Sequence, residues 1–290
     1  MFTQVLVNGI IAGVQIALLA VGFSIVYTAS RFFVFTFGSS FLCAAYAMLL
    51  VVRWTPRWIA ALIAVLVGAL LGGALERFLY RSIRNRTSSP LISMLASIGA
   101  YTALQNVVSM RFGDETRTFR TWITTEGHQF VGARISSVQI AIVLVASTAL
   151  AATFVGLYAT SLGRQLRAIA NDELVARVVG VDVEAIVLFG TILGSCLAAL
   201  AGILMSHDTD LVPTMGFQAL LLGVVAAVIG GLNSAKGALV GGLFVGLVQH
   251  LGVWRLPTEW QDGILFVVLM LFLLFRPQGF FGVPLRKATV

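Results

Sequence analysis

The sequence predicts an all-α polytopic membrane protein with about eight to nine transmembrane helices, folded as a single domain over residues 1–290. The first observation is the composition: 59% of the residues are hydrophobic and only 11% are charged. A soluble domain carries about 25% charged residues, so this chain has less than half of the usual charge for a water-exposed surface. The second observation is that the apolar residues form long runs between short polar stretches.

A helix needs about 20 mostly apolar residues to cross the hydrocarbon core of a bilayer. Such runs cover, roughly, residues 4–28, 33–52, 58–75, 91–110, 138–158, 186–205, 217–232, 238–253 and 264–275. The last three runs are short, so one or more of them is expected to be tilted, broken or re-entrant. The first run lacks the basic flank and cleavage site of a signal peptide, and we expect it to be retained.

The basic residues predict the orientation, because cytoplasmic loops are enriched in lysine and arginine. One set of alternate loops, from Arg31 to the C-terminal tail, holds 12 of the 19 basic residues, and the other set holds seven. The first set is therefore expected in the cytoplasm, with the N-terminus outside and the C-terminus inside for nine crossings. The basic residues form no stripe with interleaved aromatics, so no nucleic acid partner is expected.

The longest external segment is residues 111–137, which is too short for a domain and mixes both charges. We expect an ordered periplasmic cap or a short interfacial helix there.

A second polar segment, residues 163–185, lies on the predicted cytoplasmic side. Gly163 opens it, and the stretch LRAIANDELVARVVGVDVEA carries apolar positions at helical spacing among two arginines and four acids. Gly180 is well placed to end a helix, since glycine takes the left-handed conformation without penalty. The pattern favours a surface helix that docks on another protein. The alternative is a solvated loop that only joins two spans.

The motifs from Gly163 onward carry a family resemblance. GRQLRAIANDELVARVVGVDVEAIVLFGTILGSCLAALAGIL resembles the coupling-loop region of the permease subunits of branched-chain amino acid ABC importers, in particular the smaller, LivH-type permease. Further matches follow in the same order and cover nearly the whole chain. They are NGIIAGVQIALLAVGFSIVY (8–27), ERFLYRSIRNRTSSPLISMLASIGAYTALQN (76–106), GGLNSAKGALVGGLFVGLVQ (230–249) and FRPQGFFG (275–282).

This resemblance implies a type II ABC importer-like permease in a bacterial inner membrane, with no chemistry and no cofactor of its own. The implied partners are two cytoplasmic ATP-binding subunits, a second related permease or a second copy of this chain, and a periplasmic solute-binding protein. Segment 163–185 would contact the ATPase. The residues expected to couple the two are Arg164, Arg167, Asn171, Asp172 and Gly180.

The chain departs from the family pattern at residues 34–39, which read VFTFGS where the family often has an NFAHGE-like segment. Val34, Phe37 and Ser39 replace the family's Asn, His and Glu, and Ile16 replaces a tyrosine of the first span. If those groups line the translocation path, the path here is more apolar and the substrate differs from the usual one.

Polar residues inside spans are costly and are therefore candidates for the path. Gln15 lies deep in its span, although a hydrogen bond between helices would explain it equally well. Gln105 and Asn106 lie near the outer end of a later span and are expected to contact incoming substrate. The full set is Asn8, Gln15, Ser39, Ser40, Gln105 and Asn106.

Other functions find less support in the sequence. GGLNSAKG resembles the phosphate-loop motif G-x-x-x-x-G-K-[ST], but Ala235 occupies the position of the motif's second glycine. ATP hydrolysis is therefore assigned to partner subunits. The three histidines have no metal-ligand spacing, and Asp208 and Asp210 are expected in an external loop. The alternative function is an ion-coupled secondary transporter of small polar solutes. It would need an ionisable residue inside a span, and the sequence places no acid in the middle of any predicted run.

Overall fold

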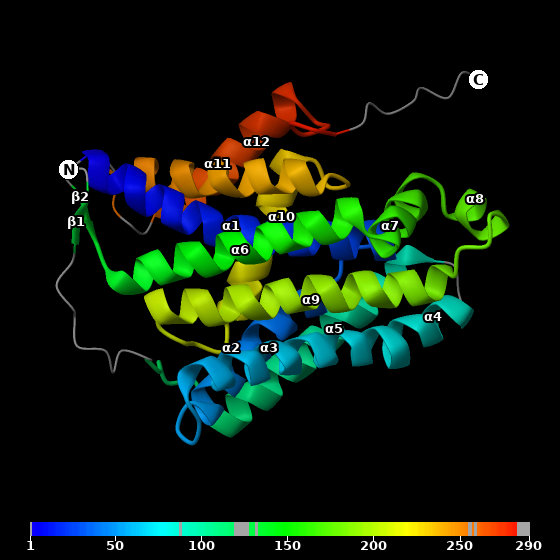
Figure 1. The fold of residues 1–290 in the computed structure, drawn as a ribbon, viewed down its shortest axis with the longest axis horizontal. Helices are drawn as coiled ribbons and strands as arrows, with labels where there is room; N and C mark the ends of the chain where they lie inside the picture. Colours follow the sequence, from blue (N-terminus) through cyan, green and yellow to red (C-terminus); the bar gives the residue numbers. More distant parts are fainter. Residues whose placement is uncertain are drawn as a thin grey trace.

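The computed structural model describes residues 2–86, 89–118, 128–130, 133–254, 257 and 260–282. It is a bundle of helices with one small hairpin (Figure 1). The helices before the hairpin are α1 Phe2–Ser30, α2 Thr36–Val51, α3 Arg57–Ala74, the π-helix η1 Leu75–Tyr80, α4 Arg81–Arg86 and α5 Pro90–Phe112. The hairpin is β1 His128–Phe130 and β2 Ala133–Ile135. The later helices are α6 Ser137–Ala159, α7 Ser161–Asn171, α8 Glu173–Val178, α9 Val183–Asp208, α10 Met215–Gly230, α11 Ala235–Val253 and α12 Gln261–Phe275.

The predicted class of helical membrane protein is confirmed. Among the described residues, six helices are long and apolar enough to cross a membrane, and one of them runs without a break through α3, η1 and α4. Three shorter apolar helices, α2, α10 and α12, complete the set. Each of the nine apolar runs in the sequence therefore forms a helix.

The long first helix, α1, forms the centre of the bundle and packs on α6, α9, α10 and α11 (Figure 1). Small residues allow the closest of these contacts. A Cβ atom added at Gly246 of α11 would overlap the backbone of Gly13 of α1, and one added at Gly242 would overlap Ala17. Close backbone approach of this kind holds helices together in lipid, where no hydrophobic force acts between them.

The outer helices turn large apolar side chains away from the bundle. Leu70 of α3 is 70% exposed, Leu95 of α5 is 69% exposed and Met270 of α12 is 75% exposed. A soluble protein would bury such residues, so these faces are the ones that contact lipid.

The helix that begins as α3 continues farther than the sequence predicts. The run 58–75 was expected to end in a basic loop, but the chain stays helical to Arg86 through the π-turn η1. Glu76, in η1, is only 2% exposed, and it accepts hydrogen bonds from Arg84 and from Thr191 of α9. The chain therefore does bury an acid within a helix that is long and apolar enough to cross a membrane, and a basic side chain pairs with it.

The hairpin lies at the end of the bundle where α1 begins (Figure 1). Its strands pair antiparallel, with His128 opposite Ile135, and the Gln4 side chain bonds both the N–H and the carbonyl of Arg134. The described part of 111–137 thus contains the last residues of α5 and a strand pair, and no interfacial helix. Residues 119–127 and 131–132 of this predicted cap lie outside the described residues.

Candidate functional sites at the two ends of the bundle

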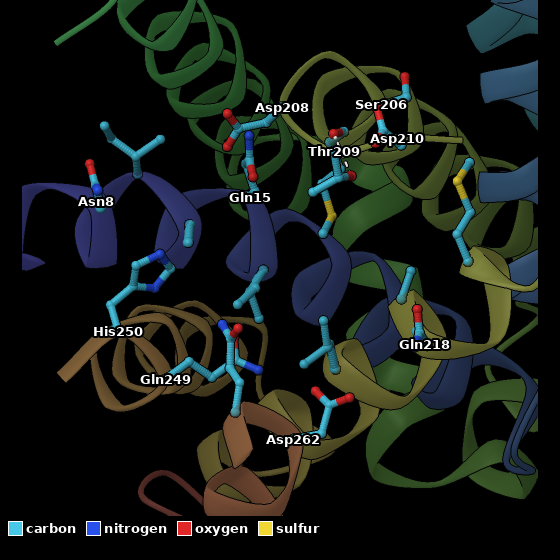
Figure 2. Close-up of a pocket in the computed structure, with 18 of the residues that line it drawn as sticks. Asn8, Gln15, Ser206, Asp208, Thr209, Asp210, Gln218, Gln249, His250 and Asp262 are labelled. Carbon is cyan, nitrogen blue, oxygen red and sulfur yellow. Dashed lines mark hydrogen bonds between the residues drawn. The ribbon is translucent and has the colours of Figure 1, made fainter. Parts of the chain in front are cut away.

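One end of the bundle contains a cavity of about 520 Å³, which we call the polar cavity. Helices α1, α6, α10 and α12 begin around it, and α9 and α11 end there (Figure 2). Its volume falls within the roughly 300–1,000 Å³ of small-molecule pockets. Its lining mixes apolar residues with polar ones from these helices.

The deep part of the polar cavity is lined by neutral amides and a hydroxyl. Gln15 and Gln249 are each 4% exposed and Ser206 is 2% exposed. The Ser206 hydroxyl donates to the Ile203 carbonyl of its own helix. The Gln15 Nε2 atom is buried and has no hydrogen-bond partner among the described residues. A buried donor without a partner is costly, so this position favours a ligand with an oxygen acceptor.

The mouth of the polar cavity is acidic. Asp208, Asp210 and Asp262 are exposed and line it, and none of the described lining residues is a lysine or an arginine. His250 also lines the cavity, and its Nδ1 atom lies 3.1 Å from the Gly246 carbonyl oxygen. The nearby Arg117 pairs with Leu211 through its backbone, and its guanidinium donates to the Phe112 carbonyl.

The structure separates the predicted path residues into two groups. Asn8 and Gln15 line the polar cavity. Ser39 and Ser40 are not among its lining residues. Both are fully buried in α2, and a Cβ added at Gly68 of α3 would lie 3.0 Å from the Ser40 carbonyl oxygen.

The last two path candidates, Gln105 and Asn106, lie on α5 away from the polar cavity. Asn106 is exposed and its amide donates to the Thr102 carbonyl at 2.8 Å. The residues that the sequence did not assign to the path are the acids of the mouth, together with Gln218, Gln249 and His250. These residues share one feature that the sequence could have shown: each is a polar residue within about one turn of a helix end, and all of these helix ends lie at the same end of the bundle.

The opposite end of the bundle carries α7 and α8, and α8 lies beyond the end of α9 (Figure 1). The single surface helix expected there is wrong, because the segment forms two short helices. Asp172 separates them: it ends α7 and its carboxylate accepts from the Leu174 and Val175 N–H groups at 2.9 and 3.1 Å. Such capping is the usual role of aspartate at a helix N-terminus. The segment also begins earlier than Gly163, since α7 starts at Ser161.

Gly180 ends α8 in the way that the sequence predicts. Its φ angle is +92°, a conformation that other residues adopt with strain. Asp182 then caps α9 by accepting from the Ala185 N–H at 3.1 Å. Asp172 and Gly180 therefore determine the shape of the segment.

The surface of α8 is apolar, although segment 163–185 as a whole contains many charged residues. We define the α8 patch as the exposed apolar side chains on and after this helix, which are Leu174 at 76%, Val175 at 58%, Val178 at 87% and Val179 at 77% exposure. Four such side chains within six residues form a small contiguous apolar surface, which is typical of a contact with another protein.

The basic residues of this end hold α7 in place. The Arg167 guanidinium lies 4.6 Å from the centre of the Tyr158 ring, and Lys236 lies 4.8 Å from the same ring. Arg31, at the end of α1, donates to the carbonyls of Ile169 and Ala170 in the last turn of α7, the first at 2.8 Å.

The two other predicted coupling residues, Arg164 and Asn171, are exposed on α7, and Arg164 reaches the Ala159 carbonyl at 3.5 Å. Within the described ranges, no group of three or more His, Cys, Asp or Glu side chains is arranged to hold a metal ion.

A helical membrane bundle with a polar cavity at one end and an exposed apolar patch at the other has the features of a membrane transport protein. Residues 5–273 match the family model described as "Branched-chain amino acid transport system / permease component". The chain belongs to this family, as the sequence motifs predicted, and is one component of a transport system. Its predicted place in a membrane is confirmed.

The relatives extend over almost the whole length of the chain. It is 31% identical to the "High-affinity branched-chain amino acid transport system permease protein LivH" of Salmonella typhimurium, over 98% of this chain and 96% of that protein. It is 29% identical to the corresponding BraD protein of Pseudomonas aeruginosa over the same shares. It is 32% identical to the "Autoinducer 2 import system permease protein LsrC" of Escherichia coli O9:H4, over 40% of this chain and 36% of that protein. No solved structure matches.

Proposed function

We propose that this chain is a transmembrane permease subunit of an ATP-driven, binding-protein-dependent importer in a bacterial inner membrane. The transported solute is a branched-chain or related amino acid. Support comes from the family and from full-length relatives that are named for branched-chain amino acid transport. The partners are two ATP-binding subunits, a second permease or a second copy of this chain, and a periplasmic binding protein.

In this proposal all nine apolar helices cross the membrane, with the N-terminus outside and the C-terminus in the cytoplasm. The polar cavity then opens outside, where a binding protein releases solute, and Asn8 and Gln15 begin the path. Segment 163–185 lies in the cytoplasm. ATP hydrolysis takes place in the partner subunits, because the nearest likeness to a phosphate loop in this chain leads into the apolar helix α11.

The observation that carries the proposal is the α8 patch. A permease without its own ATPase needs a surface that transmits the conformational change of a partner. The patch lies on the segment whose motif resembles the family's coupling loop, and its shape depends on Asp172 and Gly180. Burial of two large aliphatic side chains contributes about 3–6 kcal/mol to docking.

The test replaces Leu174 and Val178 by aspartate in the full transporter. We expect the ATPase subunits to copurify at least about tenfold more weakly, or ATP hydrolysis to lose its stimulation by the binding protein, because charges cannot enter an apolar interface. The matched control is Arg177→Gln, which removes the ion pair with Glu173 but keeps the patch.

Full copurification together with full stimulation in the aspartate variant would show that α8 does not contact the ATPase. An ATPase-deficient complex that still accumulates solute would instead support an ion-coupled transporter.

A further inference from the structure

A small cavity of about 120 Å³ lies at the end of the bundle opposite the polar cavity, and we call it the basic cavity. It is bounded by α1, the end of α6, α7 and the start of α11, which meet at this end (Figure 1). None of its described lining residues is acidic, so an anion that enters it meets no carboxylate. The polar side chains of the lining are Ser24, Thr28, Tyr158, Arg167, Asn233 and Ser234.

Two cations converge on one aromatic ring beside this cavity. The Arg167 guanidinium lies 4.6 Å from the centre of the Tyr158 ring, and the Lys236 Nζ atom lies 4.8 Å from the same centre. The two positive groups, from α7 and α11, are therefore no farther apart than these two distances together. Neither forms an ion pair with an acid of the described chain. Like charges this close repel each other, and contact with a ring offsets only part of that repulsion, so the pair favours a bound anion.

The ring itself lies where the bundle borders lipid. Tyr158 is 43% exposed in the last turn of α6, and its ring stacks on that of Phe154 with 6.2 Å between the centres. One turn earlier, Val155 is 64% exposed on the surface of the same helix. Tyrosine, arginine and lysine at the end of a membrane helix lie at the level of the lipid headgroups. An anion held here is therefore at the depth of the lipid phosphates.

The size and the hydroxyl groups of the basic cavity match a single phosphate group. Its volume is well below the roughly 300–1,000 Å³ of pockets that hold whole small molecules, which excludes a nucleotide. Ser234 accepts a hydrogen bond from the Gly237 N–H at 3.1 Å, so its own O–H group remains available to donate to a phosphate oxygen. Thr28 offers a further hydroxyl on a side chain that is only 8% exposed.

We propose that the basic cavity binds the headgroup phosphate of an anionic phospholipid, with Arg167 and Lys236 as its charged contacts. The acyl chains lie along the exposed apolar face of α6. Basic pockets between membrane helices are known binding sites for anionic headgroups. The lipid bridges α7 and α11, so the position of α7 depends on the lipid composition of the membrane. The inference requires the membrane location of the chain and is independent of its substrate and protein partners.

The test is native mass spectrometry of the purified membrane complex with added phosphatidylglycerol or phosphatidylethanolamine of the same acyl chains. Both lipids carry the phosphate, but in phosphatidylethanolamine an ammonium group neutralises it. We expect phosphatidylglycerol to bind at least about tenfold more tightly, because two cations contact its uncompensated charge. The same spectrum gives the mass of the assembled complex, so loss of lipid is distinguished from loss of assembly.

Four variants test the residues of the site. Lys236→Gln should weaken binding of phosphatidylglycerol about fivefold and leave phosphatidylethanolamine unchanged. Tyr158→Leu keeps both charges but removes the ring that positions them, and it should also weaken binding, whereas Tyr158→Phe should preserve it. The matched control is Arg81→Gln, which removes one positive charge from α4, where Arg81 pairs with Glu184 and does not line the cavity. It should bind phosphatidylglycerol like the unmodified protein.

The proposal is overturned if the two lipids bind equally well, or if Lys236→Gln and Arg81→Gln weaken binding to the same extent, which would indicate a general effect of charge. Inorganic phosphate is added at the same concentration as a third probe. Displacement of phosphatidylglycerol by this ion would identify a free anion as the ligand and would also overturn the proposal. The readout involves neither transport nor ATP hydrolysis, so its outcome is separate from that of the proposed function.

Discussion

The replacement Gly68→Ala tests whether α3 and α9 are held together by backbone proximity. A Cβ atom at position 68 would lie 2.5 Å from the Ala199 Cβ atom and 3.0 Å from the Ser40 carbonyl oxygen, whereas ordinary contacts lie at 3.4–4 Å. The two helices would have to separate by about 1 Å, and overpacking of this kind costs about 2 kcal/mol. The gain in helix propensity offsets about 1 kcal/mol of this cost.

The control for this replacement is Gly156→Ala in α6, where an added Cβ atom meets nothing within 4 Å. It receives the same propensity gain without the overlap, so the two variants should differ by about 2 kcal/mol in the free energy of unfolding. The measurement is reversible unfolding with SDS in mixed micelles, followed by circular dichroism. Adding Ala199→Gly to Gly68→Ala should restore most of the stability. Equal stability of the two single variants would refute the packing argument.

Two further replacements test local features of the structure, the buried ion pair of Glu76 and the turn at Gly180. Arg84→Met should destabilise the protein by about 3 kcal/mol, because it leaves the Glu76 carboxylate buried without its partner, and Glu76→Gln in the same chain should recover most of the loss in an SDS unfolding titration. At Gly180, alanine should lower binding-protein-stimulated ATP hydrolysis and asparagine should largely preserve it, because asparagine tolerates a positive φ angle. Equal activity of the two Gly180 variants would show that the left-handed turn has no influence on coupling.

The membrane-crossing helices could be predicted from the sequence because lipid imposes a simple rule on length and polarity. Local backbone structure could also be predicted where it depends on one residue, as at Gly180, which ends α8 in the left-handed conformation. Asp172 shows the limit of such reasoning: the sequence marked it as a coupling residue, and the structure adds that its carboxylate caps α8. The sequence alone does not distinguish a surface acid from a capping acid within a continuous helical pattern.

Features that depend on long-range packing could not be predicted. Ser40 looked like a path residue because it is polar within a span, but close approach of α3 at Gly68 buries it. Glu76 looked like a loop residue because the π-turn that carries it into the bundle has no distinct periodicity. Asp210 and Asp262 are far apart in the chain, and only the fold places them around one cavity.

The hydrogen bonds from Arg31 to the end of α7 have a mechanical consequence. Arg31 follows the last residue of α1, and Gln15 lies 16 residues earlier on the same helix, which corresponds to about 24 Å along the axis. If docking of a partner tilts α7, as the proposed function requires, α7 must either break these bonds or move α1 with it. In the proposed function α1 is then the single continuous helix that connects the end of α7 with the polar cavity.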